Sequence, residues 1–224
     1  HLRVEGEAVL RLQRVFAEDW IYSAGEDDCL EEIAAQTPRP DTPGETPALV
    51  LASGPDSSWE AIHRLYVGAI HGARQRVWLA TPYFVPGEAA IMALTSAALA
   101  GLDVRLLVPK RSDSVLAALA ARSYFDTLME AGVKVHEYGP RMLHTKALLI
   151  DDHMVLVGSA NFDHRSFRLN FEVSMLLDGE ELAAELEQHL EGEFENAPEV
   201  KAESKRPLRH RLPEALARLL SPLL

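Results

Sequence analysis

A polar pattern runs through the hydrophobic stretch between residues 144 and 172. Its first half is His144, Lys146 and Asp151, and a Gly-Ser-x-Asn follows at residues 158–161. An imidazole that reaches both protonation states near neutral pH can attack an electrophile or protonate a leaving oxygen. Ammonium, hydroxyl and amide donors stabilise the charge of a pentacoordinate phosphorus transition state. The pattern therefore predicts phosphoryl transfer.

This prediction depends on the length of the pattern. A single His-x-Lys is common in proteins and indicates nothing about function by itself. Here it is followed by an aspartate, a Gly-Ser-x-Asn at 158–161, and a carboxylate, Glu172, that could orient the imidazole. The nine histidines show no His-x-x-x-His spacing, and the single Cys29 rules out a Cys-x-x-Cys pair, so we expect no metal and no other cofactor.

Elements that could position these groups alternate from Ala48 onward. Short apolar runs predict strands, and a glycine ends each of two helices, at Gly101 and Gly132. Ser57 or Ser58 is expected to cap the first helix of this region. The expected strands are residues 48–53, 76–84, 103–109 and 133–138, with helices carrying residues 62–70, 88–100 and 114–131 between them. This alternation predicts parallel strands with helices on both faces of a sheet.

Three further strand-like runs follow with no expected helix between them, at residues 142–150, 154–159 and 171–177. The first two are joined by a hairpin-sized turn at residues 151–153. The expected fold class is therefore α/β, a mixed β-sheet sandwiched between helices. Alternate side chains of a strand share a face, so His144 and Lys146 should lie together at a sheet edge that faces an open cleft.

The chain divides into four expected segments. Residues 1–36 form a helical remnant, residues 37–47 a Pro-rich linker, residues 48–198 the main lobe, and residues 199–224 a basic amphipathic tail. An acidic, solvated helix is expected near the end of the main lobe. The tail places basic residues before one leucine face, which suits either an anionic membrane surface or packing on the domain. Those leucines are Leu212, Leu216, Leu219, Leu220 and Leu223.

Charge and composition narrow the class of function. The net charge of −12 argues against a broad nucleic-acid footprint, because phosphate backbones require a basic surface. No apolar run reaches membrane-spanning length. The single cysteine cannot form an internal disulfide and fits a reducing compartment. Because the first residue is His1, we expect a fragment or a processed chain.

The pattern resembles the HKD motif of the phospholipase D superfamily, and the flanking sequence is similar to its bacterial cardiolipin synthase branch. The stretches that carry this similarity are HLRVEGEAV (1–9), SGPDS (53–57), TPYFVP (81–86), GLDVRLLVPKRSD (101–113), AGVKVHEY (131–138), GSANFDHRSFRLNFE (158–172) and the closing SPLL. The resemblance implies that His144 acts as general acid and base opposite a phosphohistidine formed on a second histidine. It also implies a phospholipase D-like lobe as the fold of residues 48–198.

The resemblance assigns the other site residues as well. Lys146 and Asn161 would hold phosphate oxygens with support from Ser159. Glu172 would orient a histidine. Asp151 is a named member of the motif, and its spacing from Lys146 indicates that it supports the loop.

The resemblance further implies the reaction of two phosphatidylglycerol molecules to give cardiolipin and glycerol, peripherally on the cytoplasmic side of the bacterial cell membrane. Tyr83 could help to exclude water, or could simply pack a strand end. Four arginines are candidates for lipid headgroups, although each could instead form a surface salt bridge. They are Arg111, Arg141, Arg165 and Arg168.

The chain departs from the family pattern in one respect, and this leaves alternative functions open. The resemblance implies two HKD motifs, but only His144 among the nine histidines is followed two residues later by lysine. The missing partner would be an N-terminal HKD lobe or a second copy of the chain. A single-motif homodimer acting as another phosphodiesterase or a nuclease is one alternative. A non-catalytic lobe for membrane docking or assembly is the other.

Overall fold

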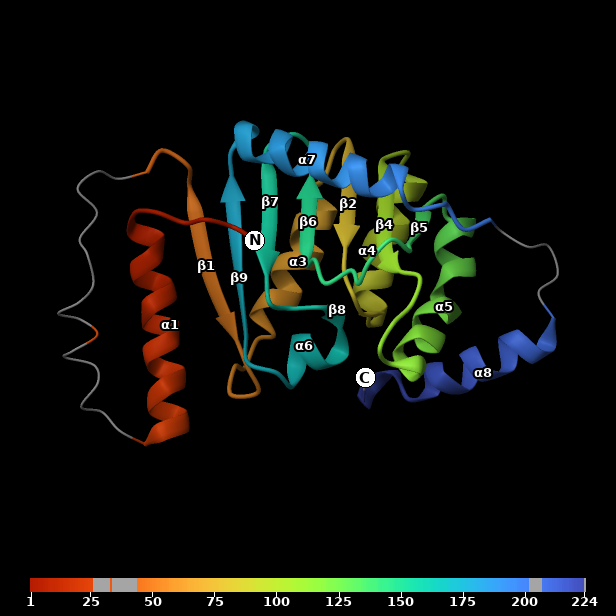
Figure 1. The fold of residues 1–224 in the computed structure, drawn as a ribbon, viewed down its shortest axis with the longest axis horizontal. Helices are drawn as coiled ribbons and strands as arrows, with labels where there is room; N and C mark the ends of the chain where they lie inside the picture. Colours follow the sequence, from red (N-terminus) through yellow and green to blue (C-terminus); the bar gives the residue numbers. More distant parts are fainter. Residues whose placement is uncertain (26–32, 34–43, 202–206, 224) are drawn as a thin grey trace.

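The computed structural model describes residues 1–25, 33, 44–201 and 207–223, and it contains a mixed sheet between two helical layers. The seven strands lie in the order β1-β9-β7-β6-β2-β4-β5. Only β2, β4 and β5 pair in parallel, and the other neighbours are antiparallel. A short parallel pair, β3 and β8, lies beside this sheet. The expected fold class is confirmed (Figure 1).

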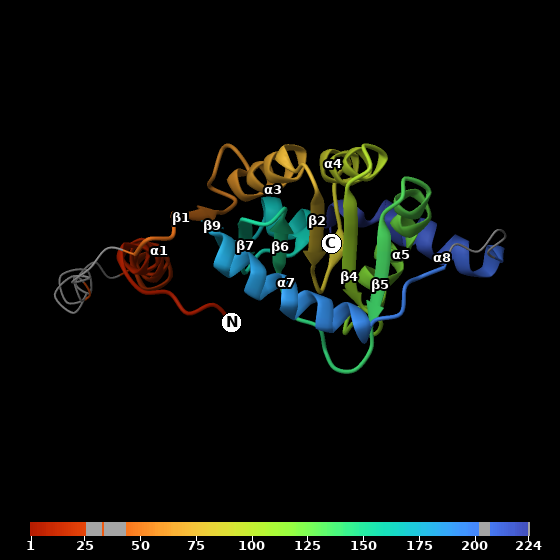
Figure 2. The ribbon, with the colours of Figure 1, turned by 90° about the horizontal axis from the view of Figure 1, so that it is seen from above.

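The strands are β1 Ala48–Ser53, β2 Arg76–Ala80, β3 Phe84–Val85, β4 Asp103–Pro109, β5 Lys134–Tyr138, β6 Ala147–Ile150, β7 Met154–Gly158, β8 Phe162–Asp163 and β9 Glu172–Asp178. The helices are α1 Glu7–Ala24, α3 Ala61–Gly72, α4 Glu88–Leu99, α5 Val115–Glu130, α6 His164–Arg168, α7 Glu180–Glu195 and α8 Leu208–Leu219, followed by the 3₁₀ helix η1 Ser221–Leu223. Helices α3, α4 and α5 cover one face of the sheet, and α7 covers the other (Figure 2).

The central strands are buried on both faces. In β2, Val77 and Leu79 point into the core beneath α3 and α4, while Trp78 and Ala80 point into the core beneath α7. This alternation follows from the two-residue period of a strand. It explains why the central strands read as nearly continuous apolar runs.

Several local expectations were wrong. Helix α3 begins after Glu60, which has a left-handed φ of 47°, and not at Ser57 or Ser58. The expected strand over residues 142–150 begins only at Ala147, because residues 142–146 form no regular strand. Strand β8 and helix α6 fill the connection that was expected to hold no helix.

Two helices differ from their expected burial. Helix α7 was expected to be solvated, but one face of it is buried through Ala183, Leu190 and Phe194. In α1 the apolar spacing predicts a packing face, and this face is only partly covered: Phe16 is 55% exposed and Trp20 is 46% exposed, whereas the others are half-buried, namely Val9, Leu12, Val15 and Ile21. Helix α7 covers the second face of the sheet. Helix α1 instead lies beside β1, the last strand at one side of the sheet (Figure 2).

Most of the expected linker, residues 37–43, lies outside the described residues, as do Cys29, Lys205 and Arg206. Within the part of the chain that is described, no helix combines the length and the apolarity needed to cross a bilayer.

Candidate active site

The topology brings the ends of several strands to one edge of the sheet. Strand β2 ends there at Ala80, which pairs with Ala147 at the start of antiparallel β6. Strand β7 ends at the same edge with Gly158, which pairs with Ser174 near the start of β9. The segments just beyond these ends therefore meet, and they are the segments that carry the motif residues.

His144 and Lys146 lie in the extended segment before β6. The imidazole is exposed, and Lys146 is half-buried. Lys146 Nζ donates a hydrogen bond to the carbonyl oxygen of His144 at 3.1 Å. Burial lowers the pKa of Lys146 below its ordinary value, while the charges of Glu172 and Asp163 oppose this shift. The ammonium is therefore partly shielded from water and is influenced by the charges of two carboxylates.

Ser159 and Glu172 form a second part of the site. Ser159 Oγ donates to the Glu172 carboxylate and accepts from the Val173 N–H at 3.0 Å. Asn170 Nδ2 donates to the other Glu172 oxygen at 3.1 Å. The glycine before Ser159 is required here, because a Cβ on Gly158 would lie 2.5 Å from Val173 O. These contacts fix the orientation of the Glu172 carboxylate.

Asn161 is positioned by its main chain. Its N–H donates to Ser166 Oγ at 3.0 Å, and Ser166 is fully buried. The next residue, Phe162, donates its N–H to Thr81 Oγ1 at 3.1 Å, which ties this segment to the end of β2. Asn161 Oδ1 is buried with no hydrogen-bond partner among the described residues. A buried polar atom without a partner marks a place where a ligand can bind.

Asp163 belongs to this site but was not predicted. It is 5% exposed, and it caps α6 by accepting a hydrogen bond from Ser166 N at 2.7 Å. Burial raises the pKa of Asp163, while the bonds with Ser166 lower it. An aspartate three residues before Ser166 is a helix N-cap signal that could have identified the start of α6.

Asp151 lies at the opposite end of β6 from Lys146. Its carboxylate accepts hydrogen bonds from the main-chain N–H groups of Arg74, Gln75 and Arg76 at 2.8 to 3.1 Å. With φ of 53°, it also forms the tight β6–β7 turn. This geometry supports a structural role for Asp151 in joining that turn to the start of β2.

The residues expected to contact the substrate differ in whether the structure already gives them a partner. Tyr83 donates to Asp113 at 2.5 Å, and this hydrogen bond raises the pKa of Tyr83 to about 12. Its neighbour Phe84 is buried and stacks on Phe162, so this part of the stretch packs a strand end. Arg165 is exposed, and among the described residues neither it nor Arg111 forms an ion pair.

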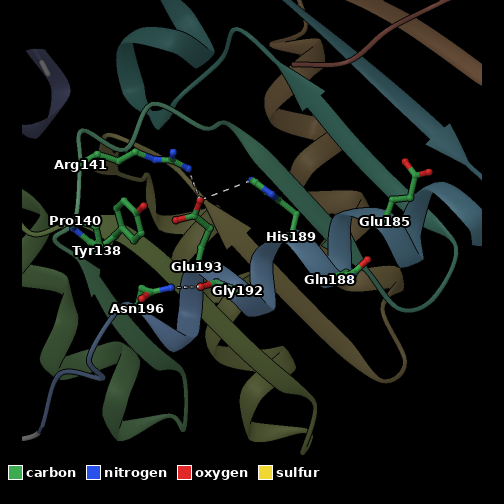
Figure 3. Close-up of a pocket in the computed structure, with 9 residues that line it drawn as sticks. All are labelled: Tyr138, Pro140, Arg141, Glu185, Gln188, His189, Gly192, Glu193 and Asn196. Atoms are coloured by element: carbon green, nitrogen blue, oxygen red, sulfur yellow. Dashed lines mark hydrogen bonds and ion pairs between the residues drawn. The ribbon is translucent and has the colours of Figure 1, made fainter.

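The other two candidate arginines are already paired. Arg168 Nε donates to Glu60 at 2.9 Å, and Arg141 donates to Glu193 at 3.0 Å. Arg141 lies three residues before His144, so its pair with Glu193 ties the segment that carries His144 to α7. The two side chains line an open groove of about 680 Å³, in which His189 also approaches Glu193 at 3.8 Å (Figure 3).

Sequence comparison extends these findings. Residues 66–194 match the family described as "Cardiolipin synthase, PLD-like domain". A cardiolipin synthase of Geobacillus kaustophilus (strain HTA426) is 43% identical over 226 residues, which cover 100% of this chain and 45% of that protein. Cardiolipin synthase A of Pseudomonas fluorescens (strain Pf-5) is 42% identical over 229 residues, covering 100% and 46%. The chain thus spans about half the length of these relatives.

Solved structures agree on the fold. The phospholipase D family member Nuc from Salmonella typhimurium superposes with a TM-score of 0.61 at 21% identity, over 70% of this chain and 100% of that one. Phosphatidylserine synthase from Haemophilus influenzae Rd KW20 gives a TM-score of 0.62 at 16% identity, over 81% of this chain and 49% of that one. With the family match over most of the lobe and relatives aligned along the full chain, the chain belongs to the cardiolipin synthase family of PLD-like domains.

Proposed function

We propose that this chain is the C-terminal catalytic lobe of a cardiolipin synthase, which transfers a phosphatidyl group between two phosphatidylglycerol molecules to give cardiolipin and glycerol. The observation that carries the proposal is the convergence of the His144–Lys146 segment, Ser159, Asn161 and Glu172 at one edge of the sheet. The aligned relatives, each named as a cardiolipin synthase, support the choice of substrate class.

The proposed reaction has two displacements. In the first, an imidazole nitrogen attacks phosphorus, a P–N bond forms, and the P–O bond to the glycerol headgroup breaks as a second imidazole protonates the departing oxygen. In the second, a headgroup hydroxyl of another phosphatidylglycerol gives its own proton to the second imidazole as its oxygen attacks phosphorus. The P–N bond then breaks and cardiolipin is released. We assign the acid and base role to His144.

Other residues stabilise the charge that develops on phosphorus. Lys146 is half-buried, so its ammonium acts in a medium of lower dielectric than water and interacts more strongly with a phosphate oxygen. The amide of Asn161 has one end without a partner among the described residues, and exchanging its oxygen and nitrogen would present a donor to a second phosphate oxygen. Ser159 holds Glu172, which we assign to orienting a histidine.

Two substrate contacts complete the proposal. Arg165 is exposed beside Asp163 and is assigned to a lipid headgroup. Tyr83, which remains protonated at neutral pH, is assigned to the wall that limits access of water. The enzyme would act peripherally at the cytoplasmic side of the bacterial membrane, where its lipid substrates lie.

A second imidazole must come from outside this single motif. We assign it to an N-terminal HKD lobe, because the chain spans only about 45% of its relatives' length. A second copy facing the first across a two-fold axis is the competing source. In either case an isolated monomer of residues 1–224 should show little or no transfer, since the effects of cooperating catalytic groups are not additive.

The test measures glycerol release from phosphatidylglycerol by residues 1–224, alone and after addition of the N-terminal half of its protein, with the solution mass determined in parallel. Activity should depend on the added half and should be abolished by His144→Ala. Robust turnover by a monomer would refute the two-lobe mechanism, and turnover by a dimer would assign the second histidine to another copy. Cleavage of DNA in place of phosphatidylglycerol would refute the substrate assignment.

A further inference from the structure

Helix α8 turns its leucines away from the protein. The leucines of residues 208–223 were equally compatible with packing on the domain, but the structure leaves all of them uncovered. Their exposed fractions run from 43% to 77%, and they are Leu208, Leu212, Leu216, Leu219, Leu220 and Leu223. We call these six residues the leucine face. An apolar surface of this kind on a soluble domain marks a site of interaction.

The orientation of α8 is fixed by its opposite side. Ala217 is 2% exposed and Ser221 is 4% exposed where α8 and η1 pack on α5. Tyr124 of α5 donates to Ser221 Oγ at 3.2 Å, and the guanidinium of Arg218 lies 4.4 Å from the centre of the Tyr124 ring. Small residues thus form the contact with the domain, and the leucine face points outward as a consequence.

Charge distinguishes the possible partners. The chain carries a net charge of −12, yet residues 207–223 contain Arg209, Arg211 and Arg218 against one acid, Glu214, which is buried. Leucines beside arginines on a helix of this length suit the boundary between headgroups and acyl chains of an anionic bilayer. Helix α1, another element with exposed apolar side chains, at Phe16 and Trp20, contains three acidic residues and two arginines, which suits an anionic surface less well.

Position links this face to the candidate active site. Helix α8 runs beneath α5, and η1 ends against α6, the helix that follows Asn161 (Figure 1). The C-terminal end of the leucine face therefore lies near the segment that carries Asn161. At 1.5 Å per residue, the twelve residues of α8 extend about 18 Å, which is enough to lie along a bilayer surface.

We propose that the leucine face of α8 inserts into the surface of an anionic phospholipid bilayer and so holds the His144 edge against its lipid substrates. This inference rests on the proposed function for its choice of substrate. The bilayer is distinguished from a second copy or an N-terminal lobe by the arginines that accompany the leucines. The leucines enter the acyl boundary, while the exposed Arg211 interacts with lipid phosphates.

The test measures co-sedimentation of the 224-residue chain with vesicles of phosphatidylglycerol and phosphatidylcholine, and with vesicles of phosphatidylcholine alone. The variant L212S/L216S/L219S removes exposed side chains only, so its folding should be unchanged by circular dichroism. The matched control is Leu99→Ser, a leucine of α4 that is 74% exposed. The triple variant should lower partitioning into anionic vesicles by more than about tenfold, and the control should not.

A second variant tests the contribution of charge. Arg211→Glu should weaken binding to anionic vesicles, and added salt should reduce binding of the unaltered chain. Equal partitioning of the unaltered chain and the triple variant would overturn the proposal. So would a dimer that dissociates in the triple variant while vesicle binding persists, because the face would then belong to a second copy. Binding is measured without turnover, so failure of the proposed reaction would be seen separately, in the glycerol assay.

Discussion

Arg76 donates hydrogen bonds to Asp151 from both its main chain and its side chain. The Arg76 main-chain N–H donates to Asp151 Oδ1 at 3.0 Å, and the Arg76 guanidinium Nε donates to the Asp151 carbonyl oxygen at 2.7 Å. The carboxylate also accepts from the N–H of Gln75 at 2.8 Å. This named member of the motif therefore connects the β6–β7 turn to the start of β2, far from the imidazole at the other end of β6.

Asp151→Ala should therefore lower stability more than it affects chemistry. Main-chain N–H groups of residues 74–76 would lose a charged acceptor, so the free energy of unfolding should fall by about 2–4 kcal/mol in urea titrations. Asp152→Ala is the matched control, because the Asp152 side chain is 65% exposed, and it should leave the urea midpoint unchanged. A stable but inactive Asp151→Ala protein would contradict the structural assignment.

Lys146→Met should affect chemistry more than it affects stability. Burial lowers the pKa of Lys146, which means that the folded state disfavours its charge. Its removal should therefore not lower the free energy of unfolding, although phosphatidyl transfer by the complemented enzyme should fall by about a thousandfold or more. Lys134→Met, on an exposed lysine paired with Asp103, should retain activity. A loss of stability in Lys146→Met comparable to that in Asp151→Ala would count against this account.

Asp163→Asn should change the pH dependence of stability. The folded-state pKa of Asp163 lies above its ordinary 3.8, so the folded state binds the proton more tightly than the unfolded state. This contribution to stability is present at low pH and is lost as pH rises from about 3.8 through the raised pKa. Asparagine retains the N-cap acceptor, so the variant should flatten that region of the curve and be at least as stable at neutral pH.

The control for this experiment is Asp163→Ala, which removes both the charge and the hydrogen bond to Ser166 N. It should be less stable than Asp163→Asn at every pH. If thermal unfolding of Asp163→Asn follows the same pH curve as the unaltered chain, the titration of Asp163 does not contribute to stability.

Glu193→Ala should test the attachment of the catalytic segment to α7. Glu193 accepts from Arg141 (Figure 3). Its interaction with the Tyr138 hydroxyl raises the pKa of that group. Without these contacts the segment before His144 is less constrained, so kcat in the complemented enzyme should fall about threefold to tenfold. Glu191→Ala, on the exposed side of α7, should leave kcat unchanged. An unaltered kcat in Glu193→Ala would show that this ion pair does not position His144.

The order of helices and strands was predictable from the sequence. Apolar periodicity located β4 and α5 almost to the residue, and Ser114 caps α5 while Gly132, with φ of 101°, follows its end. These signals are local, because they depend on side-chain spacing and on backbone conformations that few residues adopt. Helix α6 was missed because it has only five residues, too few for a helical period to be recognised.

The spacing of the motif likewise predicted, by itself, which residues could act on phosphorus and that their segments border strands. Only the tertiary structure decided how they are used. It placed Asp151 at the far end of β6, buried Asp163 where its charge acts on Lys146, and paired Arg141 with Glu193. It also turned the leucines of α8 outward, because the small residues at Ala217 and Ser221 make the closer contact with α5. A linear pattern records which side chains share a face, whereas the choice of the buried face depends on the surface that the rest of the chain presents to it.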